Sequence, residues 1–230
     1  MSKISTIPEN SIQLCRIFHE IRNPLALISS SLQLIESDHP EVTDFRFWNQ
    51  TRKDLSQLCT LLEDLSSYQK CTLLSTTKIH LFDFLEDLAE ATETFLLSGN
   101  HPLHIINAVP EADFYGDERK LRHALINLLK NAAESSAHGT PIFLRCTGSK
   151  NRLFISICDK GPGMTKEQLL HLYDPFYTTK SDGTGLGLPI TQKIIQSHGG
   201  SLLTSSCPGF GTVFTVSLPI DFQCDESNFS

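Results

Sequence analysis

Apolar residues in the first seventy positions recur at alternating steps of four and three. This is the spacing of a two-stranded helical seam, whose first members are Leu14, Phe18, Ile21, Leu25, Ile28, Leu32 and Ile35. After a polar break around residues 37–40, a similar rhythm continues through Trp48, Leu55, Leu58, Leu62 and Leu65. The pattern predicts two helices that form an antiparallel hairpin over residues 11–74.

A single hairpin of this length cannot bury both of its apolar stripes. Two copies that pair as a four-helix bundle would bury them, and we therefore expect a homodimer. The pattern leaves one alternative open, a monomeric hairpin that packs against the downstream part of the chain.

The pattern changes to mixed helices and strands from about Thr77. It predicts helices over 82–97, 117–136 and 188–198, and strands over 103–109, 142–146, 153–158, 201–205 and 212–218. The fold class is therefore α+β, with a second domain over residues 75–220. We expect residues 1–10 to be an N-terminal extension and the polar tail, 221–230, to be disordered.

Composition narrows the classes of function. The formal net charge of −7 argues against a nucleic-acid binder, whose contact face would be positive. The seven cysteines are scattered without a C-x-x-C pair, which favours reduced core residues over disulfides or a zinc site. The chain has neither a secretion signal nor the run of about 18 apolar residues of a membrane span. A complete chain of this kind would be cytoplasmic; it could equally be the catalytic part of a longer sensor.

The first chemically suggestive segment is H-E-I-R-N-P-L, residues 19–25. His19 follows a seam residue, so we expect it to face outward, with Glu20 beside it and Asn23 one turn further along the same face. Imidazole is a good phosphoryl acceptor, and a neighbouring carboxylate can take its other ring proton. Pro24 favours a bend just beyond it. For His19 taken alone, a solvated surface histidine beside a helix kink is the more common explanation.

Two further segments suggest a nucleotide pocket. Asn127 and Asn131 lie one turn apart on a predicted helix, with Lys130 beside them, and amide oxygens suit Mg²⁺. Asp159 ends a predicted strand and opens onto Gly161 and Gly163, a setting suited to the adenine amino group. A polar helix face and an ordinary turn are the plain alternatives.

A glycine-rich segment precedes the predicted helix at 188–198. Its residues are Gly183, Thr184, Gly185, Leu186 and Gly187. Glycine backbones before a helix N-terminus form an anion site for phosphates. The segment is not a G-x-x-x-x-G-K-[ST] loop, which occurs nowhere in the chain. The pocket would therefore belong to another class of ATP binder.

Taken in order, these segments resemble the conserved boxes of two-component sensor histidine kinases. Residues 19–25 resemble the H box, 127–132 the N box, 159–163 the first glycine box and 183–188 the second. Residues 174–180 resemble the F box and 209–214 the final glycine-threonine turn. The resemblance covers about residues 11–219, and the H-E-I-R-N-P form is most similar to the nitrogen-regulation type.

The resemblance implies a dimeric helical hairpin followed by an α/β sandwich ATP domain of the gyrase, chaperone and kinase superfamily. His19 would be the phosphoacceptor, Glu20 its acid-base partner, and Asn23 would position water during dephosphorylation of a response regulator. Asn131 would be the main Mg²⁺ ligand, with Asn127 and Lys130 near the phosphates. Asp159 would bind adenine with support from Thr212 through water, and Lys180 would reach toward phosphate. The glycine segments, with Thr184 and Leu186, would shape the pocket and its lid.

The sequence therefore predicts an enzyme that uses ATP and Mg²⁺ to phosphorylate His19 and passes the phosphoryl group to an aspartate of a response regulator receiver domain. A mobile joint near residues 71–77 would let the ATP domain reach His19. The alternative is an ATP-driven conformational protein of the gyrase or chaperone type, which has no need of H-E-x-x-N on a paired helix. A scaffold with a dead pocket would typically have lost Asn131, Asp159 or the glycines. The sequence does not identify the input signal.

Overall fold

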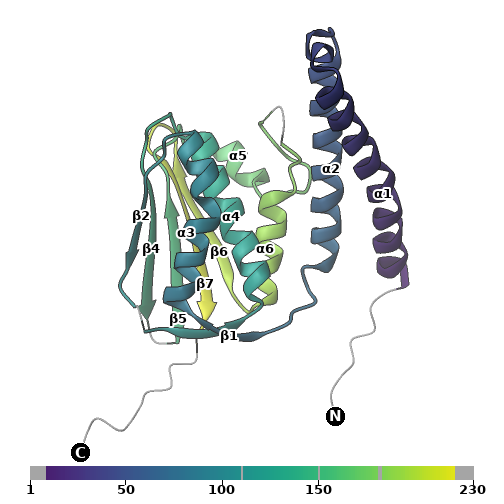
Figure 1. The fold of residues 1–230 in the computed structure, drawn as a ribbon. Coiled ribbons are helices and arrows are strands. Elements are labelled where there is room, and N and C mark those ends of the chain that lie inside the picture. The colour runs from purple at the N-terminus through teal and green to yellow at the C-terminus, as the bar shows by residue number, and fades with distance from the viewer. Residues whose placement is uncertain (1–8, 110, 150, 181–182, 221–230) are drawn as a thin grey trace, which may run out of the picture. The chain divides into compact units, whose positions relative to one another are not determined.

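A computed structural model describes residues 9–109, 111–149, 151–180 and 183–220, with side chains from residue 20 onward. The chain divides into two compact units (Figure 1). The first comprises residues 1–70 with 178–186, and the second comprises residues 71–177 with 187–230. None of the described helices combines the length and apolarity that a membrane crossing requires.

The first unit contains the predicted helical hairpin. Helix α1, Glu9–Asp38, and helix α2, Trp48–Lys70, are joined by a short 3₁₀ turn, Pro40–Asp44. An ion pair between Arg52 and Glu36 links the two helices. Among the described apolar side chains of the two helices and the turn between them, only Val42 and Leu62 are buried. The hairpin is confirmed, but most of its apolar surface is left uncovered.

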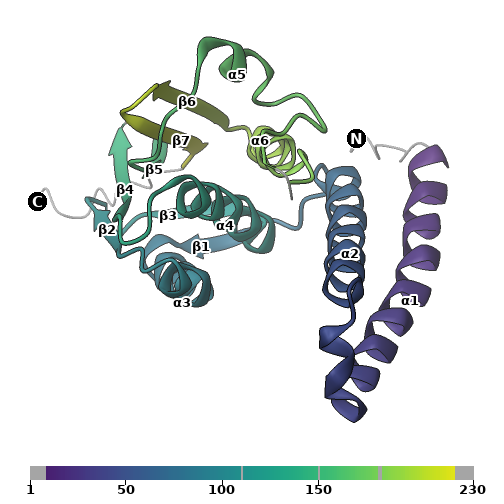
Figure 2. The same ribbon diagram turned by 90° about the horizontal axis from the view of Figure 1, so that it is seen from above.

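The second unit contains a mixed five-stranded sheet in the order β2-β4-β5-β7-β6 (Figure 2). β2 pairs in parallel with β4, and the other neighbours are antiparallel. The strand bounds are β2 Leu103–Asn107, β4 Ile142–Ser149, β5 Arg152–Cys158, β6 Ser201–Cys207 and β7 Gly211–Pro219. All five predicted strands are confirmed, although β2 ends two residues before the predicted strand.

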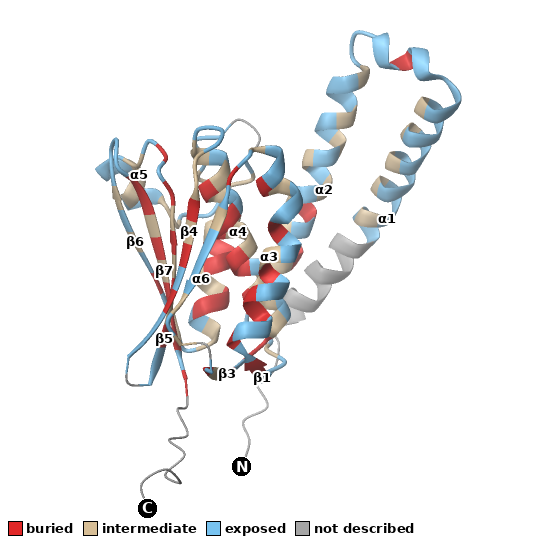
Figure 3. Ribbon diagram, turned by 60° about the vertical axis from the view of Figure 1, so that its left-hand side comes forward, coloured by how far each residue is buried: buried red, intermediate tan, exposed pale blue. Residues whose placement is uncertain are grey.

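Three helices cover one face of this sheet: α3, Leu81–Ser98, α4, Glu118–Ser135, and α6, Gly187–Ser197 (Figures 2 and 3). Buried residues alternate along β5 and β7 and recur at helical spacing on α4, as one apolar core between a sheet and a helix layer requires. The short elements β1 Thr77–His80, β3 Asp113–Gly116 and α5 Lys166–His171 were not predicted. The first two pair as a separate two-stranded sheet.

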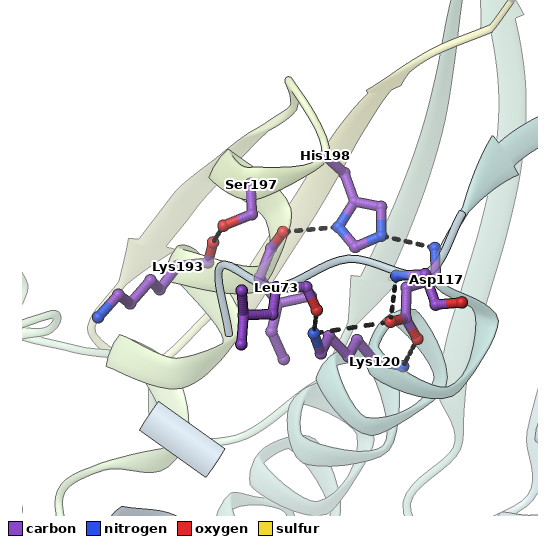
Figure 4. Close-up of polar contacts among 8 residues, drawn as sticks. Leu73, Asp117, Lys120, Lys193, Ser197 and His198 are labelled. Carbon is purple, nitrogen blue, oxygen red and sulfur yellow. Dashed lines mark hydrogen bonds and ion pairs between the residues drawn. The ribbon is translucent and has the colours of Figure 1, made fainter. Parts of the chain in front are cut away.

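The segment after α2 is attached to the second unit through Asp117 and Lys120 (Figure 4). Asp117 caps α4 by accepting a hydrogen bond from the Lys120 N–H, and its other oxygen accepts one from Ser75 N–H at 3.1 Å. The Lys120 ammonium donates to the Leu73 carbonyl. Cys71 is 1% exposed. Residues that the sequence suggested as a mobile joint therefore make specific contacts within the second unit, and the division between the units falls after Lys70.

His198 joins the start of α4 to the end of α6 in the same network (Figure 4). Its Nε2 accepts a hydrogen bond from Asp117 N–H at 2.9 Å, and its Nδ1 donates to the Ile194 carbonyl at 2.7 Å. Only the neutral ring can make both bonds. Burial, together with the charge of Lys120, lowers the pKa of His198 below 6.5, although Asp117 and the Ile194 carbonyl act in the opposite direction.

This lowered pKa predicts a loss of stability in mild acid. As the pH falls below 6.5, the unfolded chain takes up a proton at His198 before the folded chain does, so the free energy of unfolding decreases. Above that pH the contribution of the neutral ring is complete. We expect the free energy of unfolding, measured with urea, to fall more steeply between pH 7.5 and 5.5 in the wild type than in His198→Gln. Parallel pH profiles for the two proteins would contradict this.

Candidate functional site

Asp159 lies at the end of β5 and is 7% exposed. Its Oδ1 accepts hydrogen bonds from Gly161 N–H at 2.8 Å and Thr212 N–H at 3.1 Å. Burial raises the pKa of this carboxyl, and the two N–H groups partly oppose the increase. Both bonds end on one oxygen, so Oδ2 remains as the acceptor for a group that enters the site.

Thr212, on β7, supports Asp159 directly through its backbone. Its N–H reaches the carboxylate, and its carbonyl accepts a hydrogen bond from Asp159 N–H at 2.9 Å. Its hydroxyl pairs instead with Ser206 Oγ at 2.9 Å. Ser206 also accepts from Met164 N–H, so it fastens the loop after β5 to the β6–β7 pair. No motif in the sequence pointed to Ser206.

The glycines next to Asp159 allow segments of backbone to approach one another. A Cβ on Gly161 would lie 2.8 Å from the Ser135 carbonyl oxygen, at the end of α4. Gly163 has a φ of 68°, and a Cβ there would lie 2.0 Å from the Cys207 carbonyl oxygen. A side chain at either position would collide with backbone, so the fold itself requires these two glycines.

The asparagine pair lies on α4, as the spacing predicted, and both residues are half-buried. Asn127 Nδ2 donates a hydrogen bond to Thr191 Oγ1 of α6 at 2.9 Å. A Cβ on Gly187, the first residue of α6, would lie 2.5 Å from Asn127 Oδ1. The start of α6 thus meets α4 at Asn127, and no motif in the sequence indicated that Thr191 takes part.

The Lys130 side chain points toward α3 and does not join Asn127. Its side chain is exposed, and its Nζ lies 5.9 Å from the centre of the Phe95 ring on α3. An ammonium group over an aromatic face is a favourable arrangement that needs no ligand. The contribution of Lys130 to phosphate binding stays a prediction.

The second glycine segment is shared between the two units. Gly183, Thr184, Gly185 and Leu186 belong to the first unit, whereas Gly187 begins α6 in the second. Within the first unit, Thr184 Oγ1 donates to Asp64 Oδ2 of α2 at 2.6 Å and accepts from Leu186 N–H. Lys180 N–H donates to Thr178 Oγ1 at 3.1 Å. Residues 181–182 lie outside the described part of the chain.

The predicted acceptor residues lie on α1. Position 19 is within this helix, but the side chain of His19 lies outside the described residues, so its predicted outward orientation stays a prediction. Glu20 and Asn23 are exposed, and Pro24 lies inside the helix.

Known proteins are similar to this chain in both sequence and fold. Residues 116–221 match the model of the histidine kinase-, DNA gyrase B- and HSP90-like ATPases. Sporulation kinase C of Bacillus subtilis is 31% identical over 207 residues, which are 89% of this chain and 47% of that protein. The chain therefore spans about half the length of this relative.

Two solved structures have the same fold. Full-length ShkA in complex with AMPPNP superposes with a TM-score of 0.76 at 22% identity, over 90% of this chain and 45% of that one. Histidine kinase ThkA in complex with the response regulator TrrA superposes with a TM-score of 0.66 at 26% identity, over 89% of this chain and 60% of that one. Residues 116–221 thus belong to the ATPase family of histidine kinases, DNA gyrase B and HSP90, and the chain is a homologue of the sensor histidine kinases.

Proposed function

We propose that this protein is an ATP-dependent protein histidine kinase that phosphorylates His19 and transfers the phosphoryl group to an aspartate of a response regulator. The observation that carries the proposal is the buried carboxylate of Asp159, with one oxygen left for a ligand, in a domain of this ATPase family. The same chain carries H-E-I-R-N-P on a helical hairpin. Other ATPases of the superfamily have no need of that combination.

Asp159 is the residue that recognises adenine in this proposal. The exocyclic amino group of adenine is a hydrogen-bond donor, and Oδ2 is a charged acceptor in a site from which most water is excluded. The backbone bonds to Oδ1 fix the direction in which Oδ2 points. Gly161, Gly163 and Thr212 contribute by holding this carboxylate and the adjacent loop in place.

Amide oxygens are the donors offered to Mg²⁺. Among the described residues, no group of three His, Cys, Asp or Glu side chains could hold a metal ion. The missing Cβ of Gly187 lets the Asn127 amide pack against the start of α6, and Asn131 lies one turn further along α4. A few amide oxygens plus phosphate and water suit Mg²⁺ well. When bound, the ion would neutralise charge on the phosphates, with Asn131 as its main ligand.

The acceptor side of the reaction lies on α1. A neutral imidazole nitrogen of His19 attacks the terminal phosphorus, so that a nitrogen–phosphorus bond forms as the bond to the ADP oxygen breaks. Glu20 takes the proton from the other ring nitrogen. The receiver aspartate then attacks the same phosphorus and restores the imidazole. Asn23 positions water for hydrolysis of the resulting acyl phosphate.

A homodimer follows from the apolar surface of the hairpin. The exposed apolar side chains include Leu27 at 70% and Leu34 at 65%. A cavity of about 340 Å³ between α1 and α2 has a mixed lining, with apolar residues such as Leu25 and Leu62 beside polar ones such as Arg22. A second copy would bury these positions in a four-helix bundle. The second partner in this proposal is the receiver domain of a response regulator, and the ThkA–TrrA complex, a histidine kinase bound to a response regulator, supports it. The proposed location is the cytoplasm. The H-E-I-R-N-P form favours the nitrogen-regulation type of kinase.

The acceptor assignment is tested by incubating the purified chain with γ-labelled ATP and Mg²⁺. We expect label that is stable in base and lost in acid, as a phosphoramidate bond requires. His19→Gln should abolish it. His39→Gln, which changes an exposed histidine at the end of the same hairpin, is the matched control and should keep it. Label that persists in His19→Gln would show that another residue is the acceptor.

The adenine assignment is tested with Asp159→Asn. Asparagine keeps an oxygen for Gly161 and Thr212 but replaces the charged acceptor by a neutral amide. Loss of a charge-assisted hydrogen bond of about 1.5–3 kcal/mol predicts an ATP affinity about 10- to 100-fold weaker. Calorimetric titration measures this, and Asp113→Asn, a change in an ion pair with Lys78 on the β1–β3 sheet, is the control. Equal affinity in Asp159→Asn and the wild type would contradict the assignment.

A further inference from the structure

We propose that Thr191 is a positioning residue, which orients the side-chain amide of Asn127 for the nucleotide and its metal ion. This inference rests on the proposed function of the Asn127 site. It assigns a task to a buried hydroxyl that touches neither substrate nor metal.

Thr191 is an unusual residue for its position. It lies in α6 with 0% exposure, and its neighbours on the buried face of that helix are Ile190, Ile194 and Ile195. A hydroxyl in such surroundings is unfavourable unless it is hydrogen-bonded. Its partner is Asn127 Nδ2, 2.9 Å away on α4. Two residues separated by 64 positions in the sequence are thus joined where the two helices pack.

In the structure, the hydrogen bond holds the amide with its nitrogen toward Thr191. An asparagine amide has a nitrogen that donates and an oxygen that accepts. When the Thr191 hydroxyl accepts from the nitrogen, Oδ1 is the atom left for a cation. The reversed amide would present its N–H groups to the cation, with the wrong polarity. An apolar side chain at position 191 would remove the hydrogen bond that holds the amide in this position.

Gly187 supplies the second half of the arrangement. It lies four residues before Thr191, one helical turn away on the same face of α6. A Cβ there would come within 2.5 Å of Asn127 Oδ1 and 2.8 Å of Nδ2. The start of α6 therefore holds the amide nitrogen through Thr191, and at Gly187 it lets the amide pack closely against the helix backbone. A ligand oxygen fixed before binding loses less freedom when the metal and phosphates arrive.

The test is calorimetric titration of the full chain with ATP, once with Mg²⁺ and once with EDTA. Thr191→Val replaces the hydroxyl by a methyl group of similar size. We expect the gain in ATP affinity that Mg²⁺ gives to fall about 10-fold, the lower end of the range for outer-shell partners of metal ligands. Affinity in EDTA should change little. Thr191→Ser, which keeps the hydroxyl, should restore the gain. Thr191→Ala, measured in the same way, covers the case in which the valine variant does not fold.

A double-mutant cycle separates positioning from stability. In an Asn127→Ala background, Thr191→Val should cause no further loss of the Mg²⁺-dependent gain, because no amide remains to be oriented. A purely structural role would lower the melting temperature without changing the ratio of the two affinities. Two results would overturn this inference and leave the proposed function standing. One is a Mg²⁺-dependent gain in ATP affinity that is as large in Thr191→Val as in the wild type. The other is a loss of that gain on Thr191→Val that is as large in the Asn127→Ala background as in the wild type. A wild-type chain that fails to bind ATP would overturn the proposed function itself.

Discussion

The site depends on the burial of one carboxylate where two neighbouring strands meet. Asp159 follows β5, and its bonds to Gly161 and Thr212 attach it to the loop that follows and to β7. Burial makes its charge unfavourable, which is why its pKa is raised, and two backbone N–H groups offset only part of this. A mostly buried carboxylate with one oxygen outside the described hydrogen bonds is a feature that a ligand can complete, and residues chosen for stability alone rarely leave one.

The glycines around the site have different physical origins. At Gly161 and Gly163 a side chain would collide with backbone carbonyls, so glycine is needed for the loop after β5 to close at all. At Gly187 the collision would be with the amide of Asn127. Substituting the first two would disturb the fold, whereas a side chain at Gly187 would act directly on a residue of the site. The glycines of the first segment are therefore structural, whereas Gly187 of the second segment bears directly on a residue of the site.

The sequence predicted the periodic elements well and the irregular ones poorly. The helix at 117–136 and the five strands carry strong apolar periodicity, and all of them are present. β1, β3 and α5 are short and lack a strong apolar periodicity. β1 and β3 are stabilised by pairing between distant segments, whereas α5 has a local signal, the capping box of Thr165 and Gln168, that the periodicity does not detect. Asp159 and Asn127 were predicted from strand ends and helix spacing. Ser206 and Thr191 were not, since a hydroxyl can be assigned to a site only once its partner is known.

The two units bury their apolar side chains to different extents. In the second unit, Leu128, Leu144 and Ile157 are fully buried, so its sheet and helices form a closed core. In the hairpin, Leu27 and Leu34 are largely exposed. Burial of one such side chain stabilises the folded state by about 1.5–3 kcal/mol. A hairpin that leaves several of them exposed lacks this stabilisation. The second unit can therefore fold by its own packing, whereas the proposed homodimer would give the hairpin the burial that it lacks alone. Assembly of the hairpin would then be a condition for presenting His19, the proposed phosphoacceptor.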